Sequence, residues 1–273
     1  MPEQVPEGVD ASRPSVARVY DCLLGGEDNF VADRAVFARV LTIAPDAPRM
    51  AADHRAFLWR VVHYLVAEAG IRRFLDIGCG LPSRGNVHEA ARDADASARV
   101  VYVDNDPMVL AHGRALLYGD DSVTIVAGDA RRPEEIMANP VVREVTESGE
   151  PFALMLLGIL HHLTDAEDPH RIAARLRQAL PSGGYLAISH FHNPGVDIPG
   201  NRLDDIANAE QLLAETLGTG RFRTYDEILG YFGDLELIEP GLVPLREWRP
   251  SQHLPVRKRI GHYSFVGGVA RKN

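Results

Sequence analysis

Glycines and acidic residues recur where two predicted strands end, in an arrangement that suits binding of a nucleotide-like cofactor. The first stretch reads Phe-Leu-Asp-Ile-Gly-Cys-Gly-Leu-Pro over residues 74–82. Asp76 closes an apolar run, and Gly78 and Gly80 flank Cys79 in a tight turn, where the missing side chains let a ligand approach the backbone. By itself this turn is nearly as typical of an ordinary strand-to-helix connection. A dinucleotide motif would have glycine at 83, where serine stands.

Two further acidic stretches follow at matching positions. Asp104 ends the next apolar run, 24 residues after Gly80, where a carboxylate can accept hydrogen bonds from both ribose hydroxyls. Asp106 precedes a proline and is expected to cap a helix. Asp129, within Val126–Ala130, is placed to accept a hydrogen bond from an adenine amine, although a lone aspartate there is more often a turn residue.

Taken together, the three stretches resemble the class I S-adenosylmethionine-dependent methyltransferases. The resemblance covers about residues 72–190 and implies that the first stretch holds the methionine portion, the second the ribose and the third the adenine. The residues assigned to the cofactor on this basis are Asp76, Gly78, Cys79, Gly80, Asp104, Asn105, Gly128, Asp129, Ala130 and Leu157. Pro82 stands where a third glycine is common, which stiffens the loop.

A narrower resemblance covers nearly the whole chain. The stretches 20–30, 72–82, 86–89 and 101–107 are similar to an actinobacterial methyltransferase family of unassigned substrate. This resemblance implies the cofactor, S-adenosyl-L-methionine, and the fold, but no acceptor.

Four histidines follow the fourth and fifth predicted strands. His162 and His190 are the candidates for a general base, since histidine titrates near neutrality. The favoured alternative is that these histidines and their neighbours His161 and His192 only cap helices or line the cofactor pocket by packing. His190 and His192 offer two metal ligands, but no third ligand follows at a suitable spacing, so no metal is predicted.

The composition excludes several other classes. The chain has 273 residues, 45% of them hydrophobic, and a net charge of −9, which disfavours non-specific nucleic-acid binding. Its longest apolar run, 153–160, is too short to cross a bilayer, and the acidic N-terminus is unlike a signal peptide. With two cysteines, Cys22 and Cys79, a cytoplasmic location is expected. The one dense basic run, 257–259, is interpreted as a solvated surface segment.

The elements that position these residues alternate between strands and helices from residue 72 onward, which predicts an α/β fold with a doubly wound, mostly parallel sheet. Strands are expected at 73–77, 99–104, 123–127, 152–157, 185–190, 235–238 and 263–270, with helices at 87–94, 107–118, 133–138, 169–179 and 201–232. The resemblance implies a Rossmann-like seven-stranded order 3-2-1-4-5-7-6. Residues 1–70 form a helical N-terminal extension, with helices at 15–24 and 30–41 and a third up to 69, and residues 71–273 form the cofactor-binding core.

The predicted function is methyl transfer from S-adenosylmethionine to a small-molecule acceptor. Two alternatives stay open, a non-catalytic S-adenosylmethionine-binding or sensory module and an NAD-dependent dehydrogenase. The missing third glycine and the Gly-Asp-Ala stretch count against the dehydrogenase. The helical extension is interpreted as a cover or as a lid hinged at Gly25–Gly26, with Tyr20 and Asn29 facing the ligand. The oligomeric state does not follow from the sequence.

Overall fold

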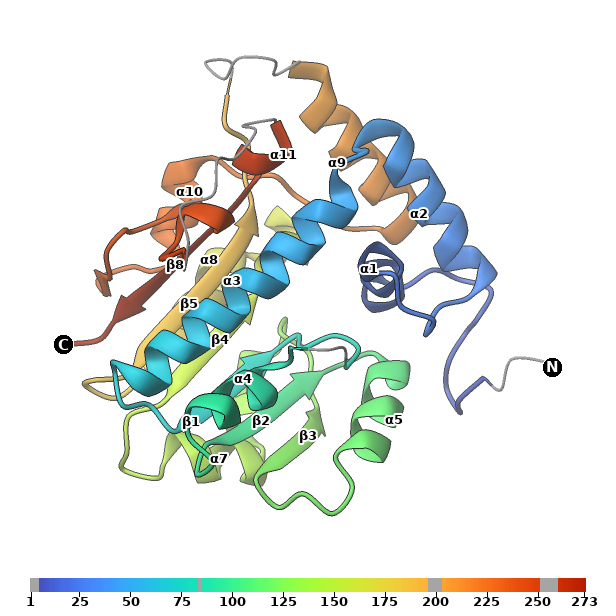
Figure 1. Ribbon diagram of the computed structural model, residues 1–273. Coiled ribbons are helices and arrows are strands. Elements are labelled where there is room, and N and C mark those ends of the chain that lie inside the picture. The colour runs from blue at the N-terminus through green and yellow to red at the C-terminus, as the bar shows by residue number, and fades with distance from the viewer. Residues whose placement is uncertain (1–4, 83–84, 196–202, 251–259) are drawn as a thin grey trace.

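One mixed sheet organises the chain (Figure 1). The computed structural model describes residues 5–82, 85–195, 203–250 and 260–273. Within them, five parallel strands are followed by antiparallel β8, in the order β3-β2-β1-β4-β5-β8-β6, with β7 also paired to β8. The strands are β1 (Arg73–Ile77), β2 (Arg99–Asp104), β3 (Val123–Ala127), β4 (Ala153–Leu157), β5 (Tyr185–Phe191), β6 (Glu236–Leu237), β7 (Val243–Pro244) and β8 (Phe265–Arg271).

The predicted fold is confirmed, with one strand more than expected. The order 3-2-1-4-5-7-6 becomes 3-2-1-4-5-8-6 because residues 243–244 add a two-residue strand beside β8. Two residues carry too little pattern to be recognised in a sequence. The parallel register pairs Asp76 with Tyr102 and Asp104 with Ala127, so the first three strands end at the same edge of the sheet.

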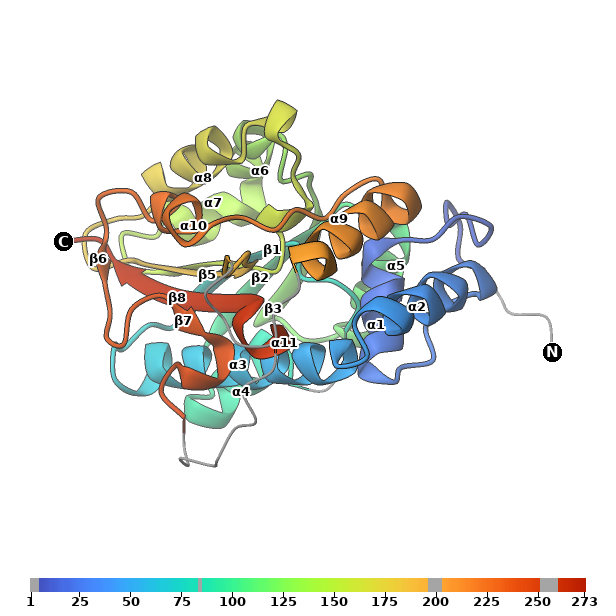
Figure 2. The ribbon, with the colours of Figure 1, turned by 90° about the horizontal axis from the view of Figure 1, so that it is seen from above.

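Helices cover both faces of the sheet (Figure 2). One face carries α6 (Pro133–Ala138), α7 (Pro140–Thr146), α8 (Pro169–Gln178) and α10 (Tyr225–Gly230), and the other carries α3 (Ala47–Ala67) and α4 (Val87–Ala94). Phe57, Val61 and Leu65, all fully buried, recur at helical spacing and hold α3 against the sheet. Helix α3 is therefore part of the core packing, while α5 (Pro107–Leu116) packs beside β3.

Two helical predictions need correction. The segment 201–232 was expected to be helical throughout, but its described part forms α9 (Leu203–Leu217) and then α10, separated by residues 218–224. Gly218 and Gly220 adopt left-handed backbone angles, and Thr224 caps α10. Helix α7 was not predicted. It begins at Pro140 behind the Asn139 cap, which explains why α6 and α7 are separate helices.

The N-terminal helices α1 (Val16–Leu24) and α2 (Val31–Ile43) lie beside the sheet and are joined by buried polar contacts. Arg18 Nε lies 2.8 Å from Asp33 Oδ2, and both side chains are buried. The same carboxylate accepts the backbone N–H groups of Ser15 and Phe30. Helix α2 packs against α9 (Figure 1), so segments far apart in sequence close over the same end of the molecule.

The remaining short elements are η1 (Leu160–His162), η2 (Asp165–Glu167), η3 (Leu245–Glu247) and α11 (Ile260–Tyr263). The basic run at 257–259 and Ser83 lie outside the described residues.

Candidate functional site

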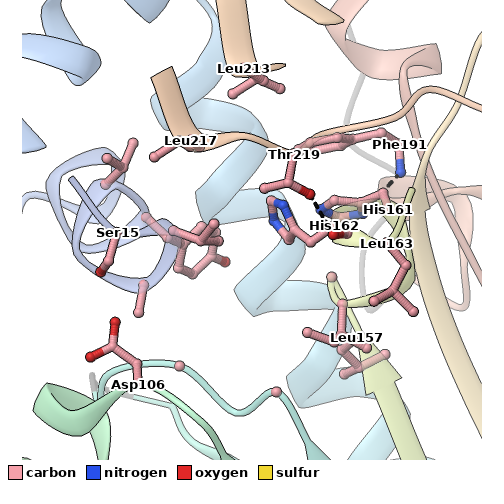
Figure 3. A pocket seen from close by; sticks show the side chains of 18 of the residues that line it. Ser15, Asp106, Leu157, His161, His162, Leu163, Phe191, Leu213, Leu217 and Thr219 are labelled. Carbon is pink, nitrogen blue, oxygen red and sulfur yellow. Dashed lines mark hydrogen bonds between the residues drawn. The ribbon is translucent and has the colours of Figure 1, made fainter. Parts of the chain in front are cut away.

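A cavity of about 670 Å³ lies at the carboxyl ends of the parallel strands. Loops after β1, β2, β3 and β4 form one side of it, and helices α1, α2, α3 and α9 form the other (Figure 3). Open α/β sheets bind ligands at this edge, and the volume is in the usual range for small-molecule sites.

The glycine loop after β1 leaves backbone open to the cavity. Gly78 and Gly80 both have positive φ, 75° and 68°. A Cβ at Gly78 would lie 2.6 Å from the side chain of Ile159, so this glycine is required by packing. A Cβ at Gly80 would meet nothing within 4 Å, so here the absent side chain leaves room for a ligand.

Asp104 lies beside this loop and is held by it. Its Oδ2 accepts the backbone N–H of Gly80 at 2.9 Å, and its Oδ1 accepts that of Asp106 at 2.9 Å. Cys79 Sγ is a further, weak donor to Oδ2, at 3.9 Å. Burial raises the pKa of the Asp104 carboxyl, while the two backbone donors lower it. Asp106 accepts the N–H of Met108, which confirms its role as a helix cap.

Asp76 is a buried carboxyl on the cavity wall. Burial raises its pKa to about 7, the Arg55 guanidinium on α3 acts in the opposite direction, and the Asp104 charge adds to the rise. A carboxyl in this range changes charge near neutral pH. A cationic ligand group beside it would favour the anion.

The third stretch, after β3, also lines the cavity. A Cβ at Gly128 would lie 2.6 Å from Val103, so the close approach of two strand ends requires glycine there. Asp129 is paired with Arg131 at 2.6 Å, which is the first cause of its lowered pKa. The other cavity-lining residues predicted for the cofactor include the exposed Asn105 and the buried Ala130 and Leu157.

The opposite part of the cavity is apolar. We call it the apolar half. Its wall is built by side chains from α1, α2, α3, α9, β5 and β8 and from the segment 218–224. It consists mainly of Val16, Leu23, Val40, Ile43, Met50, Phe191, Leu212, Leu213, Leu217, Phe222 and Phe265. Among the described residues, the charged side chains that line the cavity lie in its other part, and Arg55 lies at the border between the two parts. These charged residues are Arg55, Asp76, Asp104, Asp106, Asp129, Arg131 and Glu167.

A hydrogen-bonded chain of three side chains crosses the border of the apolar half. Tyr20 Oη lies 2.8 Å from His54 Nδ1, and His54 Nε2 lies 2.7 Å from Ser189 Oγ. Burial lowers the pKa of His54 to about 3, so its imidazole is neutral at pH 7. His54 was not predicted. Its signal in the sequence is a polar residue on the buried stripe of α3, between Ala51 and Leu58.

His161 and His162 stand on η1, directly after β4, and both line the cavity (Figure 3). His161 Nδ1 accepts the N–H of Phe191 at 3.3 Å, and the two rings stack at 3.7 Å. His162 Nδ1 is buried without a hydrogen bond within the described residues. Burial lowers the pKa of His162 to about 4.

Two predicted site residues do not reach the cavity. His190 is fully buried, its Nδ1 donates to the carbonyl of Phe191 at 2.6 Å, and Arg223 donates to its Nε2 at 3.4 Å. Both ring nitrogens are thus engaged in hydrogen bonds away from the cavity, so the prediction of His190 as a general base is wrong. Asn29 donates to Asp21 and to the carbonyl of Gly26, which fixes it inside the α1–α2 loop. Tyr20 lines the cavity, and its contact with a ligand stays a prediction.

No group of three or more potential ligands for a metal ion occurs in the described parts of the chain. Among those same residues, no helix is long and apolar enough to cross a bilayer.

Comparison with known proteins decides what kind of site this is. The family described as S-adenosyl methyltransferase matches residues 2–273. The chain belongs to this family of S-adenosyl methyltransferases. It is therefore an enzyme that uses S-adenosyl-L-methionine. The dehydrogenase and the non-catalytic module are not supported.

Solved structures agree with this family over the full length. A protein of Thermobifida fusca assigned to the methyltransferases is 40% identical, with 99% of both chains covered and a TM-score of 0.91. A DUF574 family protein from Streptomyces avermitilis is 34% identical, with 97% of this chain and 99% of that one covered and a TM-score of 0.88. A search of curated proteins found no match.

More distant methyltransferases share the fold. The mitomycin 7-O-methyltransferase MmcR is 18% identical, with 94% of this chain and 68% of that one covered and a TM-score of 0.51.

The residues at the strand ends fit the cofactor. The open side of Gly80, the carboxylate of Asp104 at the cavity wall and the buried carboxyl of Asp76 match a nucleoside with an amino-acid tail. When bound, S-adenosylmethionine supplies a methyl group activated by its positively charged sulfonium.

Proposed function

We propose that this methyltransferase acts on a neutral, largely apolar small molecule held in the apolar half of the cavity. The observation that carries this proposal is the division of the wall. Charged side chains gather at the strand ends, and the opposite wall is built from aliphatic and aromatic side chains. A charged acceptor would lose its hydration there without gaining a partner, which is costly.

We assign the cofactor residues as the sequence predicts. Asp104 accepts from the ribose hydroxyls, Asp129 and its glycine neighbour lie at the adenine, and Asp76 faces the methionine ammonium. In this arrangement, residues 78–80 direct the sulfonium toward the apolar half. The enzyme's main contribution is then to align the acceptor in line with the carbon–sulfur bond and to exclude water.

Polar groups in the apolar half are few and suit an acceptor hydroxyl. Tyr20 and His162 present one phenol and one neutral imidazole. A hydroxyl nucleophile can donate its proton toward His162 Nε2, for which a neutral imidazole is the competent form. MmcR, which shares the fold, is named for a small-molecule acceptor.

We also propose that α1 and α2 close over the cavity as a unit. The Arg18–Asp33 pair ties the two helices together, and the bonds of Asn29 fix the loop that contains Gly25 and Gly26. Any closure therefore moves both helices together, with no hinge at the two glycines. Both cysteines are free thiols, which supports a reducing compartment, the cytoplasm.

Labelled S-adenosylmethionine tests the acceptor class. The protein is incubated with methyl-labelled cofactor and the small-molecule fraction of Streptomyces avermitilis or Thermobifida fusca cells, and the products are separated by charge. We expect label in neutral compounds that extract into organic solvent at pH 7. Label found only in ionic small molecules would contradict the proposal, as would label in added protein or nucleic acid.

One variant and its control test whether the acceptor binds in the apolar half. L213D places a charge in its wall and is expected to abolish methylation while S-adenosylhomocysteine still binds, because Leu213 lies away from the strand ends (Figure 3). L116D, on the exposed end of α5, is the control and is expected to keep full activity.

A further inference from the structure

One arginine at the cavity border has no role in the assignments above. Among the described residues that line the cavity, only Arg55 and Arg131 carry a permanent positive charge. Arg131 is committed to Asp129, with Nε and Nη2 bonded to its carboxylate, and it also pairs with Glu167 at 3.5 Å. Arg55 comes from α3, an element outside the cofactor motifs.

The position of Arg55 is defined by its neighbours. Its Nη2 donates to Asn86 Oδ1 at 2.7 Å, and Asn86 caps α4 directly after the glycine loop. Its charge also acts on the buried carboxyl of Asp76 and on Tyr20. Arg55 therefore lies between the glycine loop and the apolar half, at the methionine end of the cofactor site.

The chemistry of the cofactor tail calls for such a group. The methionine portion ends in an ammonium and a carboxylate. Asp76 suits the ammonium, but it would repel the carboxylate, as would the neighbouring Asp104. A guanidinium has five donors in a planar fork, which matches a carboxylate with two parallel hydrogen bonds.

We propose that Arg55 binds the methionine carboxylate of S-adenosylmethionine and, with Asp76, selects the zwitterionic tail. Helix α3 thus contributes directly to cofactor recognition, and the same helix carries His54 toward the apolar half. This inference rests on the cofactor, and it is independent of the acceptor proposed above.

A double-mutant-type cycle, with two forms of the protein and two ligands, tests the contact between Arg55 and the methionine carboxylate. Calorimetry, with displacement titrations for weak binders, gives the affinity of the native protein and of R55Q for S-adenosylhomocysteine and for its decarboxylated analogue. We expect R55Q to weaken S-adenosylhomocysteine binding by about tenfold or more, the scale of a charge-assisted bond. Binding of the decarboxylated analogue is expected to change much less, because it lacks the carboxylate and R55Q acts on it only through the ionisation of Asp76.

Two further variants serve as controls. R49Q removes the same charge from an exposed position on α3 that does not line the cavity, and it is expected to bind both ligands normally. R55K keeps the charge without the fork, and it is expected to fall between the native protein and R55Q. It also provides the test should R55Q fail to fold.

The proposal is overturned if R55Q leaves S-adenosylhomocysteine binding unchanged, or if it weakens both ligands equally. Failure of the native protein to bind S-adenosylhomocysteine would overturn the cofactor site itself. Failure to find a neutral acceptor would leave the Arg55 result unaffected, so the two proposals fail separately.

Discussion

The two parts of the cavity are built in different ways. The strand-end part comes from three short stretches, each a strand followed by its own loop, and the parallel register brings those loops together. The apolar half is assembled from α1, α2, α3, α9, the ends of β5 and β8 and the segment 218–224. The first part is local in sequence and charged, and the second depends on the packing of distant segments.

This difference explains what could be predicted. Asp104 ends β2 and Asp129 lies two residues after the end of β3, so their common location follows from the alternation of strands and helices. His54 and Arg55 lie within an amphipathic helix whose apolar stripe predicts burial but not a partner. The sequence does not predict that Phe222 and the residues of α9 line the cavity. It predicts one continuous helix over 201–232 and so misses the break between α9 and α10.

The histidines show the same limit. His162 and His190 both follow parallel strands, and from the sequence they were equivalent candidates. Strand β5 continues through Phe191, which keeps His190 inside the sheet and engages both of its nitrogens. Strand β4 ends at Leu157, so His162 emerges at the cavity wall. Strand β5 extends two residues beyond the point where β4 ends, and a difference of this size cannot be predicted from the sequence pattern.

The largest effect is expected from closing the open side of Gly80. G80V puts a branched side chain into the cavity at a left-handed position, and we expect S-adenosylhomocysteine affinity to fall by roughly a hundredfold or more, about 3 kcal/mol. G119V is the matched control. Gly119 also has positive φ and open space, but it does not line the cavity, so its strain should leave affinity intact. Equal affinity losses in the two variants would show that strain, and not occlusion, is responsible.

Asp104 tests the ribose assignment. D104A is expected to weaken S-adenosylhomocysteine binding by about 1.5–3 kcal/mol, as for other bonds to charged groups. N139A removes the side-chain cap of α7, and Asn139 does not line the cavity, so this control should lower the free energy of unfolding by about 1 kcal/mol with little change in affinity. Calorimetry and thermal melting separate the two. Unchanged affinity in folded D104A would remove the assignment.

The raised pKa of Asp76 predicts a pH dependence of cofactor binding. The carboxyl is neutral below about pH 7 and anionic above it, and the ligand ammonium favours the anion. Affinity for S-adenosylhomocysteine should therefore rise from pH 5.5 to pH 8, by up to about tenfold per pH unit below the pKa. D76N should bind with a flat profile over this range. The same slope in D76N would assign the titration to another group.

The smallest effect is expected in the hydrogen exchange of α1 and α2, the helices that cover the cavity. Saturating S-adenosylhomocysteine should slow amide hydrogen exchange in residues 15–40, with the α1 and α2 segments protected together because the Arg18–Asp33 pair joins them. Protection confined to the glycine loop would make the two helices a static cover. Protection of only one of the two helices would contradict their movement as a unit.

A crystal structure of the protein with S-adenosylhomocysteine tests the division of the cavity most directly. We predict that the ribose lies on Asp104, that the amino-acid tail lies between Asp76 and Arg55, and that the sulfur faces the apolar half beside Tyr20 and His162. A nucleoside bound in the apolar half, or a tail directed away from α3, would contradict this account.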